Sequence, residues 1–296
     1  MRTRDFLFAV AAACLWGGGG VVGVLLGNHE DYAPVGVAAW RMGLAGIALL
    51  AVLAMLGRLH PGRWTGAMWW RMLVTGALTA AFEYAFFTSV SFSSVGLATL
   101  VGIGSAPVVV AGYDAVVTKT RPPARSVAAL VLSLGGLGLL VGGSVGQGSR
   151  MLLGVLVALG AGMAFAALTI ANRTPVPGLN AMALTGGAFT AGGLLLTPFA
   201  LAAGTDLPHD AEGWWLAIAL GVGITALAYV LFLAALETVP PFVATIVTLL
   251  EPLLGAILGA IVFGERLGWL GIVGGALMGC AVVLLRPQRD EPETIH

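Results

Sequence analysis

Apolar residues form ten long runs along the chain, and short polar or proline-containing breaks separate each run from the next. Each run has about the 20 residues that a helix needs to cross a lipid bilayer. The pattern predicts transmembrane helices at 6–27, 35–57, 69–90, 94–117, 124–144, 151–171, 179–203, 213–236, 240–263 and 268–286. We therefore expect an all-α membrane protein with ten transmembrane helices.

The composition agrees with this fold class and excludes soluble ones. Of the 296 residues, 58% are hydrophobic and 9% are charged, whereas soluble domains carry about 25% charged residues. The formal net charge is zero, so the protein has no basic field that would hold a nucleic acid. The sequence therefore predicts a lipid bilayer, and no nucleic acid, as a partner of the chain.

Residues for catalysis or metal binding are scarce. The single lysine, Lys119, follows no P-loop motif, and the chain contains no HExxH motif. Cys14 and Cys280 lie in apolar runs, which is typical of small buried hydrophobic residues. An intramembrane enzyme would need a nucleophile and base or a metal cluster at depth, but His29, His60, His209 and His296 lie in polar connections or at the terminus. We therefore expect no enzyme, no cofactor and no metal site.

The basic residues are concentrated in alternate breaks. With the N-terminus inside, Arg150 and Arg266 are the basic residues of the outer breaks. The inner breaks and termini hold most of the 14, namely Arg2, Arg4, Arg58, Arg63, Arg71, Lys119, Arg121, Arg125, Arg173, Arg286 and Arg289. Because cytoplasmic loops are enriched in Lys and Arg, the pattern predicts a multi-pass protein of the cell (inner) membrane with both termini in the cytoplasm.

The two halves of the chain resemble each other at an offset of 145 residues. Trp69-Trp70 recurs as Trp214-Trp215, and the same offset relates Gly76 to Gly221, Ala81 to Ala226, Tyr84 to Tyr229, Phe87 to Phe232 and Pro107 to Pro252. Because each half has an odd number of helices, the second half must enter the membrane in the opposite orientation. We therefore predict two inverted five-helix repeats, residues 1–146 and 147–296.

Inverted repeats are typical of secondary transporters, in which two halves surround a central site and expose it alternately to each side. An inverted-repeat channel or scramblase is the alternative. The pH dependence of flux discriminates between them, because channels generally need no proton-titrating site.

Three ionisable side chains are expected inside the membrane, where each is costly. Arg41 and Glu83 both lie roughly 9 Å from the outer face, so they form either a structural ion pair or a clamp for a substrate carboxylate and amine. Glu251 lies roughly 16 Å deep, with no basic residue expected at its depth. Glu251 is therefore either protonated and hydrogen-bonded to Thr or Ser, or it gains and loses a proton during transport.

Helical spacing adds polar neighbours to both carboxyl groups. Thr75 and Thr79 share a stripe with Glu83, and Thr245 and Thr248 lie on the same side of their helix as Glu251. These hydroxyls either line a wet cavity or bond back to their own helices. Tyr84 and Tyr229 are symmetry mates that act either as gates or as ordinary packing residues.

Glycine and proline interrupt corresponding spans of the two halves, which is typical of a transport site. The interruptions fall at Gly102, Gly104 and Pro107 in the fourth span, and at Pro252 and Gly255 in the ninth. A broken helix frees carbonyl groups that must face water, protein or substrate.

Several motifs resemble the EamA-type family of the drug/metabolite transporter superfamily over nearly the whole chain. They are Trp16-Gly17 followed by Arg41, Gly104-Ser105-Ala106-Pro107, Leu250-Glu251-Pro252 and Gly264-Glu265-Arg266. The last motif is degraded to Lys119-Thr120-Arg121 in the first half, and Met163-Ala164 stands where a tryptophan-containing pair is expected. The resemblance implies an inner-membrane exporter of amino acids, other metabolites or drugs, with a cavity between helices 1, 3, 4, 6, 8 and 9 that includes Trp16 and Ser105.

Together these observations predict a secondary active transporter that exports small organic solutes by alternating access, with protons as the candidate coupling ion. A substrate exchanger of the same superfamily is a second alternative. Exchangers of anionic phosphates need several buried basic groups, whereas this chain offers only Arg41 within a span. The identity of the substrate, the resting conformation and the oligomeric state stay open.

Overall fold

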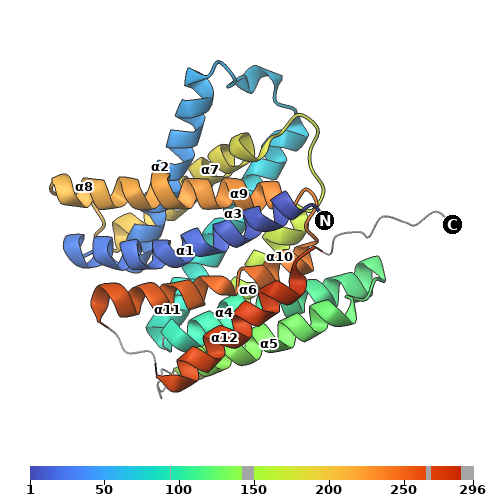
Figure 1. The fold of residues 1–296 in the computed structure, drawn as a ribbon. Coiled ribbons are helices and arrows are strands. Elements are labelled where there is room, and N and C mark those ends of the chain that lie inside the picture. The colour runs from blue at the N-terminus through green and yellow to red at the C-terminus, as the bar shows by residue number, and fades with distance from the viewer. Residues whose placement is uncertain (94, 142–149, 265–267, 288–296) are drawn as a thin grey trace.

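The structure, a computed structural model, describes residues 1–93, 95–141, 150–264 and 268–287. Its helices follow the ten predicted spans closely (Figure 1). They are α1 (Thr3–Glu30), α2 (Pro34–Met55), α3 (Gly66–Phe92), α4 (Val95–Tyr113), α5 (Ala124–Val141), α6 (Met151–Ala171), α7 (Ala181–Ala202), α8 (Ala211–Ile218), α9 (Leu227–Ala235), α10 (Pro241–Val247), α11 (Leu250–Phe263) and α12 (Trp269–Leu285). A 3₁₀ turn, η1 (Pro61–Arg63), and two π-helical segments, η2 (Asp114–Thr118) and η4 (Ala219–Ala226), complete the described helices. The predicted boundary between residues 146 and 147 lies outside the described residues.

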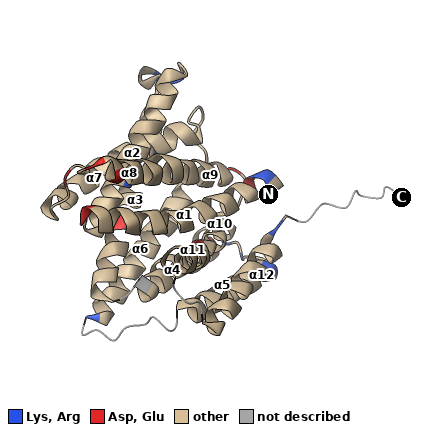
Figure 2. Ribbon diagram, turned by 60° about the vertical axis from the view of Figure 1, so that its left-hand side comes forward, with Lys and Arg blue, Asp and Glu red and all other residues tan. Residues whose placement is uncertain are grey.

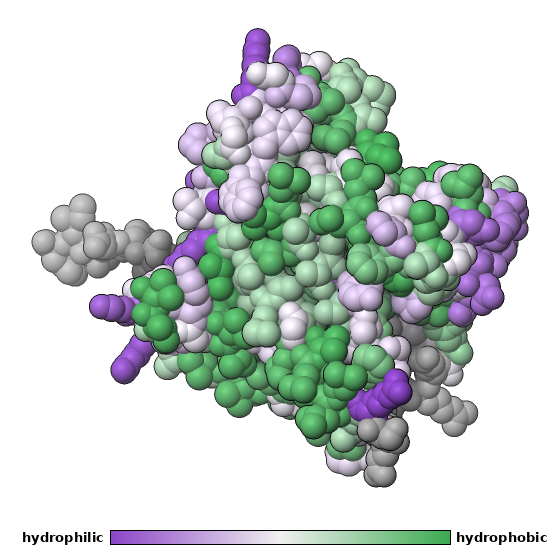
Figure 3. Space-filling view, turned by 180° about the vertical axis from the view of Figure 1, so that it is seen from behind, coloured by the Kyte–Doolittle hydropathy of each residue, from purple (hydrophilic) through white to green (hydrophobic). Residues whose placement is uncertain are grey.

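Nine helical segments of the described chain are long and apolar enough to cross a membrane, and α12 is a shorter apolar helix. Large apolar side chains cover the outer surface, with Leu194 68%, Ile261 73% and Ile272 64% exposed. Hydrophilic residues gather at two opposite edges of the molecule, and the surface between them is mostly apolar (Figure 3). Since a soluble protein rarely exposes an apolar surface of this extent, the chain is a multi-pass membrane protein.

The helices pair in a twofold pattern. α2 packs against α7, and α5 packs against α12, so equivalent helices of the two halves meet. α3 packs against α6 and α7, and its equivalent, the continuous helix made by α8, η4 and α9, packs against α1 and α2. Trp70 and Trp215, which open these two helices, are both 69% exposed.

The paired equivalent helices run in opposite directions. Along α2, the positions Gly43, Gly46 and Leu50 meet Gly193, Thr190 and Gly186 of α7 in descending order. In the second pair, Gly136 of α5 meets Met278, and Leu140 meets Gly274. Because each helix is antiparallel to its own equivalent, the second half is inverted relative to the first, which confirms the predicted architecture.

One expectation about helix interruptions is wrong. The helix α4 is continuous from Val95 to Tyr113 and includes Gly102, Gly104 and Pro107. Gly102 packs against Phe86 and Ala158, and Gly104 against Leu134. Glycine at these positions allows close contact between helices. One proline removes a single backbone hydrogen bond from a membrane helix, and neighbouring groups compensate for it.

The ninth span is interrupted between α10 and α11, at Thr248 and Leu249, whereas Pro252 and Gly255, the predicted points of interruption, lie inside α11. The amide groups of Leu249 and Glu251 donate to carbonyl groups three residues earlier, those of Ile246 (3.1 Å) and Thr248 (2.9 Å). Pro252 explains this tightening, because its ring clashes with the carbonyl of residue i−4, which is Thr248. The fourth and ninth spans therefore share a proline but not a break.

The connections between the helices lie on two faces of the molecule, the N-terminal face and the distal face. The N-terminal face holds the start of α1 and the connections 56–65, 172–180 and 236–240. The distal face holds the connections 31–33 and 203–210. The ends of α1 and of the α8–α9 helix can be followed to these faces in Figure 1.

Gly76 tests the packing between the halves. A Cβ atom at this position would lie 3.0 Å from the carbonyl carbon of Ala188 and 3.1 Å from the amide nitrogen of Gly192, both of them backbone atoms that cannot rotate away. We expect Gly76→Ala to destabilise the protein by about 1–3 kcal/mol, the usual cost of overpacking. Gly160→Ala is the control, since nothing lies within 4 Å of its Cβ. Equal melting temperatures of the two variants in detergent would contradict this packing.

Candidate functional site

An aromatic cluster fills the centre of the molecule between the two halves. The ring centroid of Trp16 on α1 lies 4.8 Å from that of Tyr229 and 5.2 Å from that of Phe232, both on α9. The centroid distance is 5.7 Å between Phe165 on α6 and Phe232, and 4.5 Å between Phe189 on α7 and Tyr229. All five residues are buried, so the two halves meet in an apolar core that contains the indole and phenol groups.

Arg41 of α2 and Glu83 of α3 form an ion pair beside this cluster. The Glu83 side chain is 2% exposed and the Arg41 side chain 18% exposed. The pair confirms the expectation that the two residues share a depth on neighbouring helices. Each charge compensates the other, which makes both tolerable in a low-dielectric interior.

Arg41 also lies within electrostatic range of Tyr229 and Glu251. The expectation that Glu251 has no basic residue at its depth is therefore wrong. Depth along a single helix does not include the tilt and rotation of α2 and α11 relative to each other. The structure instead brings Arg41, Glu83, Tyr229 and Glu251 into one electrostatic group.

Glu251 lies in the first turn of α11, directly after the helix break, and it is half-buried. Its backbone packs closely against α1, since a Cβ atom at Gly17 would lie 2.9 Å from the Glu251 carbonyl oxygen. Gly17 therefore allows α1 to place its neighbour Trp16 next to this turn. The Trp16-Gly17 pair and the Leu250-Glu251-Pro252 motif are brought together from opposite ends of the sequence.

Two buried donors of this group have no hydrogen-bond partner among the described residues. They are the indole Nε1 of Trp16 and the Nε of Arg41. An unsatisfied buried donor costs about 1–3 kcal/mol. Two such donors in one central region are available to an acceptor group of a ligand.

The predicted threonine stripes do not open onto a cavity in this conformation. The hydroxyl of Thr79 donates to the carbonyl of Thr75 (2.8 Å), and Thr245 donates to Pro241 (3.0 Å). Thr248 donates to the carbonyl of Thr245 (2.9 Å). These three hydroxyls bond back to their own helix, which was one of the two alternatives that the sequence left open, whereas the Thr75 hydroxyl donates to Asn172 at the end of α6 (3.3 Å).

Two other candidates lie outside the central group. Tyr84 is 41% exposed and packs against Phe199 on the outer surface, whereas its symmetry mate Tyr229 is 3% exposed. Ser105 lies where α4 contacts Gly162 of α6 and donates to the Gly102 carbonyl (3.5 Å). Glu265 and Arg266 of the predicted turn motif lie outside the described residues.

Sequence reasoning missed Phe165, Phe189 and Phe232 as site residues. Phe232 carried a signal, because it repeats Phe87 at the offset of 145 residues. It also missed Asn172, whose amide nitrogen donates to Thr75 (3.1 Å) and joins α6 to α3. Such residues are ordinary apolar or helix-end positions until the packing of the helices places them.

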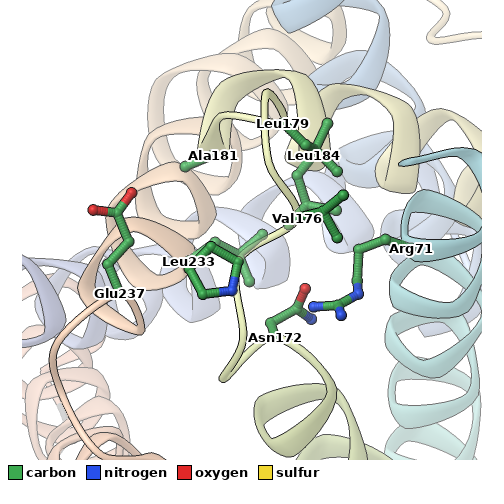
Figure 4. Close-up of a pocket in the computed structure, with 9 residues that line it drawn as sticks. Arg71, Asn172, Val176, Leu179, Ala181, Leu184, Leu233 and Glu237 are labelled. Atoms are coloured by element: carbon green, nitrogen blue, oxygen red, sulfur yellow. The ribbon is translucent and has the colours of Figure 1, made fainter. Parts of the chain in front are cut away.

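The central group is closed from the N-terminal face. The hydroxyl of Thr238 donates to Asp5 at the start of α1 (2.7 Å), and Arg71 donates to the Thr174 carbonyl (2.9 Å). Two hollows lie at this face: a cavity of about 30 Å³ between Arg71, Asn172 and the 172–180 connection (Figure 4), and a wider hollow of about 530 Å³ beside the same connection and Thr238. The small cavity holds roughly two water molecules, and the lining of the wider hollow includes no residue of the central group.

The distal face is closed by the 203–210 connection. Tyr32 and the indole of Trp40 both donate to the carbonyl of Asp206, at 2.7 and 3.1 Å. Burial, together with the charges of Glu30 and Asp206, raises the pKa of Tyr32 to about 12. Tyr32 therefore stays protonated and keeps this bond at physiological pH, so the structure is closed at both faces.

The fold and the buried polar group define an inverted-repeat membrane protein of the transporter class. The EamA-like transporter family matches residues 4–142 and 152–286, one match for each repeat. The chain belongs to this family, within the drug/metabolite transporter superfamily.

Two known proteins are similar over nearly the whole chain. The uncharacterized transporter YwfM of Bacillus subtilis (strain 168) is 30% identical over 289 residues, which cover 96% of this chain and 95% of the relative. A crystal structure with 16% sequence identity has a TM-score of 0.79 and covers 96% of this chain and 98% of that chain. At this identity the second match shows the fold alone.

The ion pair between Arg41 and Glu83 gives a prediction about stability. Arg41→Met leaves the buried Glu83 charge without a partner, so we expect a loss of about 3–5 kcal/mol. The double variant Arg41→Met, Glu83→Gln removes both charges and recovers most of this loss. Arg173→Met is the control, because its pair with Asp114 is 39% exposed on the arginine side and is worth at most about 1 kcal/mol. Thermal unfolding in detergent measures all three, and a double variant no more stable than Arg41→Met would refute the pairing.

Proposed function

We propose that the protein is a secondary active transporter that exports small organic solutes by alternating access. The single observation that carries this proposal is the group of Arg41, Glu83, Glu251 and Trp16 between two inverted halves, in which Glu83 and Trp16 are buried and Arg41 and Glu251 are half-buried. Buried ionisable groups in membranes usually belong to substrate or ion pathways. Family membership supports the transport class, and amino acids, related metabolites or drugs are the substrates that we propose.

The substrate site lies at the central group. Arg41 Nε and Trp16 Nε1 are free to donate to a carboxylate or carbonyl oxygen of the substrate. Glu83 or Glu251 then faces an amine, and the rings of Phe165, Tyr229 and Phe232 contact the apolar part of the solute. This site is closed in the structure, so rocking of the halves must open first one face and then the other.

Glu251 is the group that we propose for coupling transport to a proton gradient. Its side chain has no hydrogen bond among the described residues, and it stands beside the helix break at Thr248. A closed, dry site favours the neutral carboxyl, whereas an open, wet site favours the charged one. Arg41 affects the protonation of Glu251. A substrate carboxylate that binds Arg41 weakens the attraction between Arg41 and Glu251, and Glu251 then takes up a proton more readily.

The runner-up functions differ in what they require. A substrate-for-substrate exchanger uses the same site without net proton movement, and a channel or scramblase needs no closed state with a buried polar group. The closure at both faces favours a carrier over a channel.

Flux measurements in proteoliposomes test the proposal and the role of Glu251 together. Counterflow against a panel of amino acids and aromatic cations identifies a substrate, and a pH gradient then tests accumulation. Glu251→Gln mimics the protonated group and keeps its shape, so we expect normal folding, surviving exchange and loss of proton-driven accumulation. Glu212→Gln is the control, since Glu212 is exposed in the first turn of α8. A Glu251→Gln variant that accumulates substrate with the parent's pH dependence excludes proton coupling through Glu251.

We further propose that the N-terminal face is cytoplasmic in the bacterial inner membrane, because the basic residues are concentrated there. A fluorescent protein fused to the C-terminus should therefore fluoresce, and alkaline phosphatase at the same position should be inactive. Phosphatase insertion into the 203–210 connection should give an active enzyme. The opposite result at both positions would reverse the proposed orientation.

A further inference from the structure

A cluster of two histidines and several carboxylates lies on the distal face, away from the central group. His29 and Glu30 end α1, whereas Asp206, His209 and Asp210 belong to the segment before α8. His29 Nε2 lies 3.0 and 3.1 Å from the two carboxylate oxygens of Asp210. His209 Nδ1 lies 2.5 Å from Glu30 Oε2, and its Nε2 lies 3.3 Å from Asp206. Segments that are 180 residues apart in sequence thus meet through imidazole and carboxylate groups.

The cluster carries an excess of negative charge. The segments 28–33 and 203–213 contain Glu30, Asp31, Asp206, Asp210 and Glu212, but no Lys or Arg. Figure 2 shows this acidic colour near the ends of α1 and α8. Glu30 is 5% exposed, and its carboxylate accepts from the backbone amide of His209 at 3.1 and 3.2 Å. Hydrogen bonds to Asp210 and Glu30 raise the pKa of His29 and of His209, so the protonated imidazoles compensate part of the negative charge, whereas the neutral ones do not.

The positions of the ligand atoms suit a small cation. One ligand atom from each of His29, Glu30 and Asp210 lies within 4.8 Å of the other two. In a tetrahedral zinc site with bonds of about 2.0–2.2 Å, the ligand atoms lie about 3.4 Å apart. Small rotations of the exposed His29 and Asp210 side chains close this difference. His209 lies beside this set of three, in contact with Glu30, and a rotation of its ring would be needed to bring a nitrogen to the ion as a fourth ligand.

The inverted repeat provides an internal comparison for this cluster. Asp210 caps α8 by accepting from the Gly213 amide (2.8 Å), and its repeat mate Thr65 caps α3 by accepting from Met68 (3.3 Å). The mates of His29, Glu30, Asp206 and His209 are Thr174, Pro175, Pro61 and Trp64. The fold therefore requires a cap at this junction, but it does not require histidines or carboxylates.

Gly213 makes room for the buried carboxylate. A Cβ atom at this position would lie 2.7 Å from the carboxyl carbon of Glu30, and the repeat mate of Gly213 is Met68. The glycine thus lets the head of Glu30 approach the first turn of α8, between the two histidines. This is a second feature of the distal junction that the opposite face lacks.

We propose that His29, Glu30, His209 and Asp210 form a binding site for a divalent transition metal ion of the Zn²⁺ type. Two imidazoles with two carboxylates suit zinc and its neighbours, whereas Mg²⁺ and Ca²⁺ prefer oxygen ligands alone. The bound ion neutralises the excess charge and joins the end of α1 to the start of α8. α1 carries Trp16, and the helix that begins with α8 carries Tyr229, so the ion holds the distal face closed over the central group.

Direct binding tests the site without any transport assay. Metal-free protein in detergent is titrated with Zn²⁺ by calorimetry, and its melting temperature is measured with and without the ion. We expect one ion per chain, stabilisation by Zn²⁺ but not by Mg²⁺, and at least a tenfold loss of affinity in His29→Ala and in His209→Ala. His60→Ala is the matched control, because His60 is exposed near the junction on the N-terminal face. Asp210→Asn keeps the helix cap and should also weaken binding.

The outcomes separate a metal site from a purely hydrogen-bonded cluster. Zn²⁺ binding that is absent, or equal in His29→Ala, His209→Ala and His60→Ala, overturns the site and leaves hydrogen-bonded pairs. Unchanged melting temperatures of the metal-free variants show that they remain folded. If either alanine variant does not fold, Asp210→Asn takes its place in the comparison of Zn²⁺ affinities.

The proposal that the bound ion holds the distal face closed rests on the proposed transport function and is tested by a separate measurement. Zn²⁺ on the distal side should slow counterflow by the parent protein and by His60→Ala, but not by His29→Ala or His209→Ala. Specific binding without slower counterflow overturns the closing role and leaves the metal site standing. A protein that binds Zn²⁺ but moves no solute instead refutes the proposed function.

Discussion

Close contact between helix backbones at glycine is the constraint on which the rest of the structure depends. In a bilayer, lipid tails are as apolar as leucine, so helices associate through packing rather than through the hydrophobic effect. Gly46 and Gly193 allow α2 and α7 to meet, and Gly136 and Gly274 do the same for α5 and α12. These are antiparallel pairs of equivalent helices, so the same contacts that join the halves also invert one relative to the other.

The central polar group depends on this arrangement. Arg41 and Glu83 come from neighbouring helices of one half, whereas Tyr229 and Glu251 come from the other. Each charge would be costly in an apolar interior on its own. Bringing both halves together compensates part of that cost and leaves Trp16 and Arg41 each with a buried donor that has no partner among the described residues. The side chains that stabilise the contact between the halves are therefore the same ones that we propose to bind the solute.

The symmetry of the fold does not extend to its chemistry. Pro107 lies inside a continuous helix, whereas Pro252 follows a break that frees the turn holding Glu251. Tyr84 is exposed on the surface, and Tyr229 is buried at the centre. At the distal junction, His29 and Glu30 replace the neutral residues of the opposite face. The inverted repeat thus supplies two similar junctions, one at each face, that differ in their chemistry.

The sequence by itself determined the ten helices, the inverted repeat and the shared depth of Arg41 and Glu83 on neighbouring helices. These follow from apolar length, from an odd number of helices in each half and from depth along a helix, all of which are local quantities. Tertiary structure decided that Arg41 also approaches Glu251, that Tyr84 leaves the site and that His29 meets Asp210. Helix tilt and rotation fix these contacts, and they arise from packing between segments far apart in the chain.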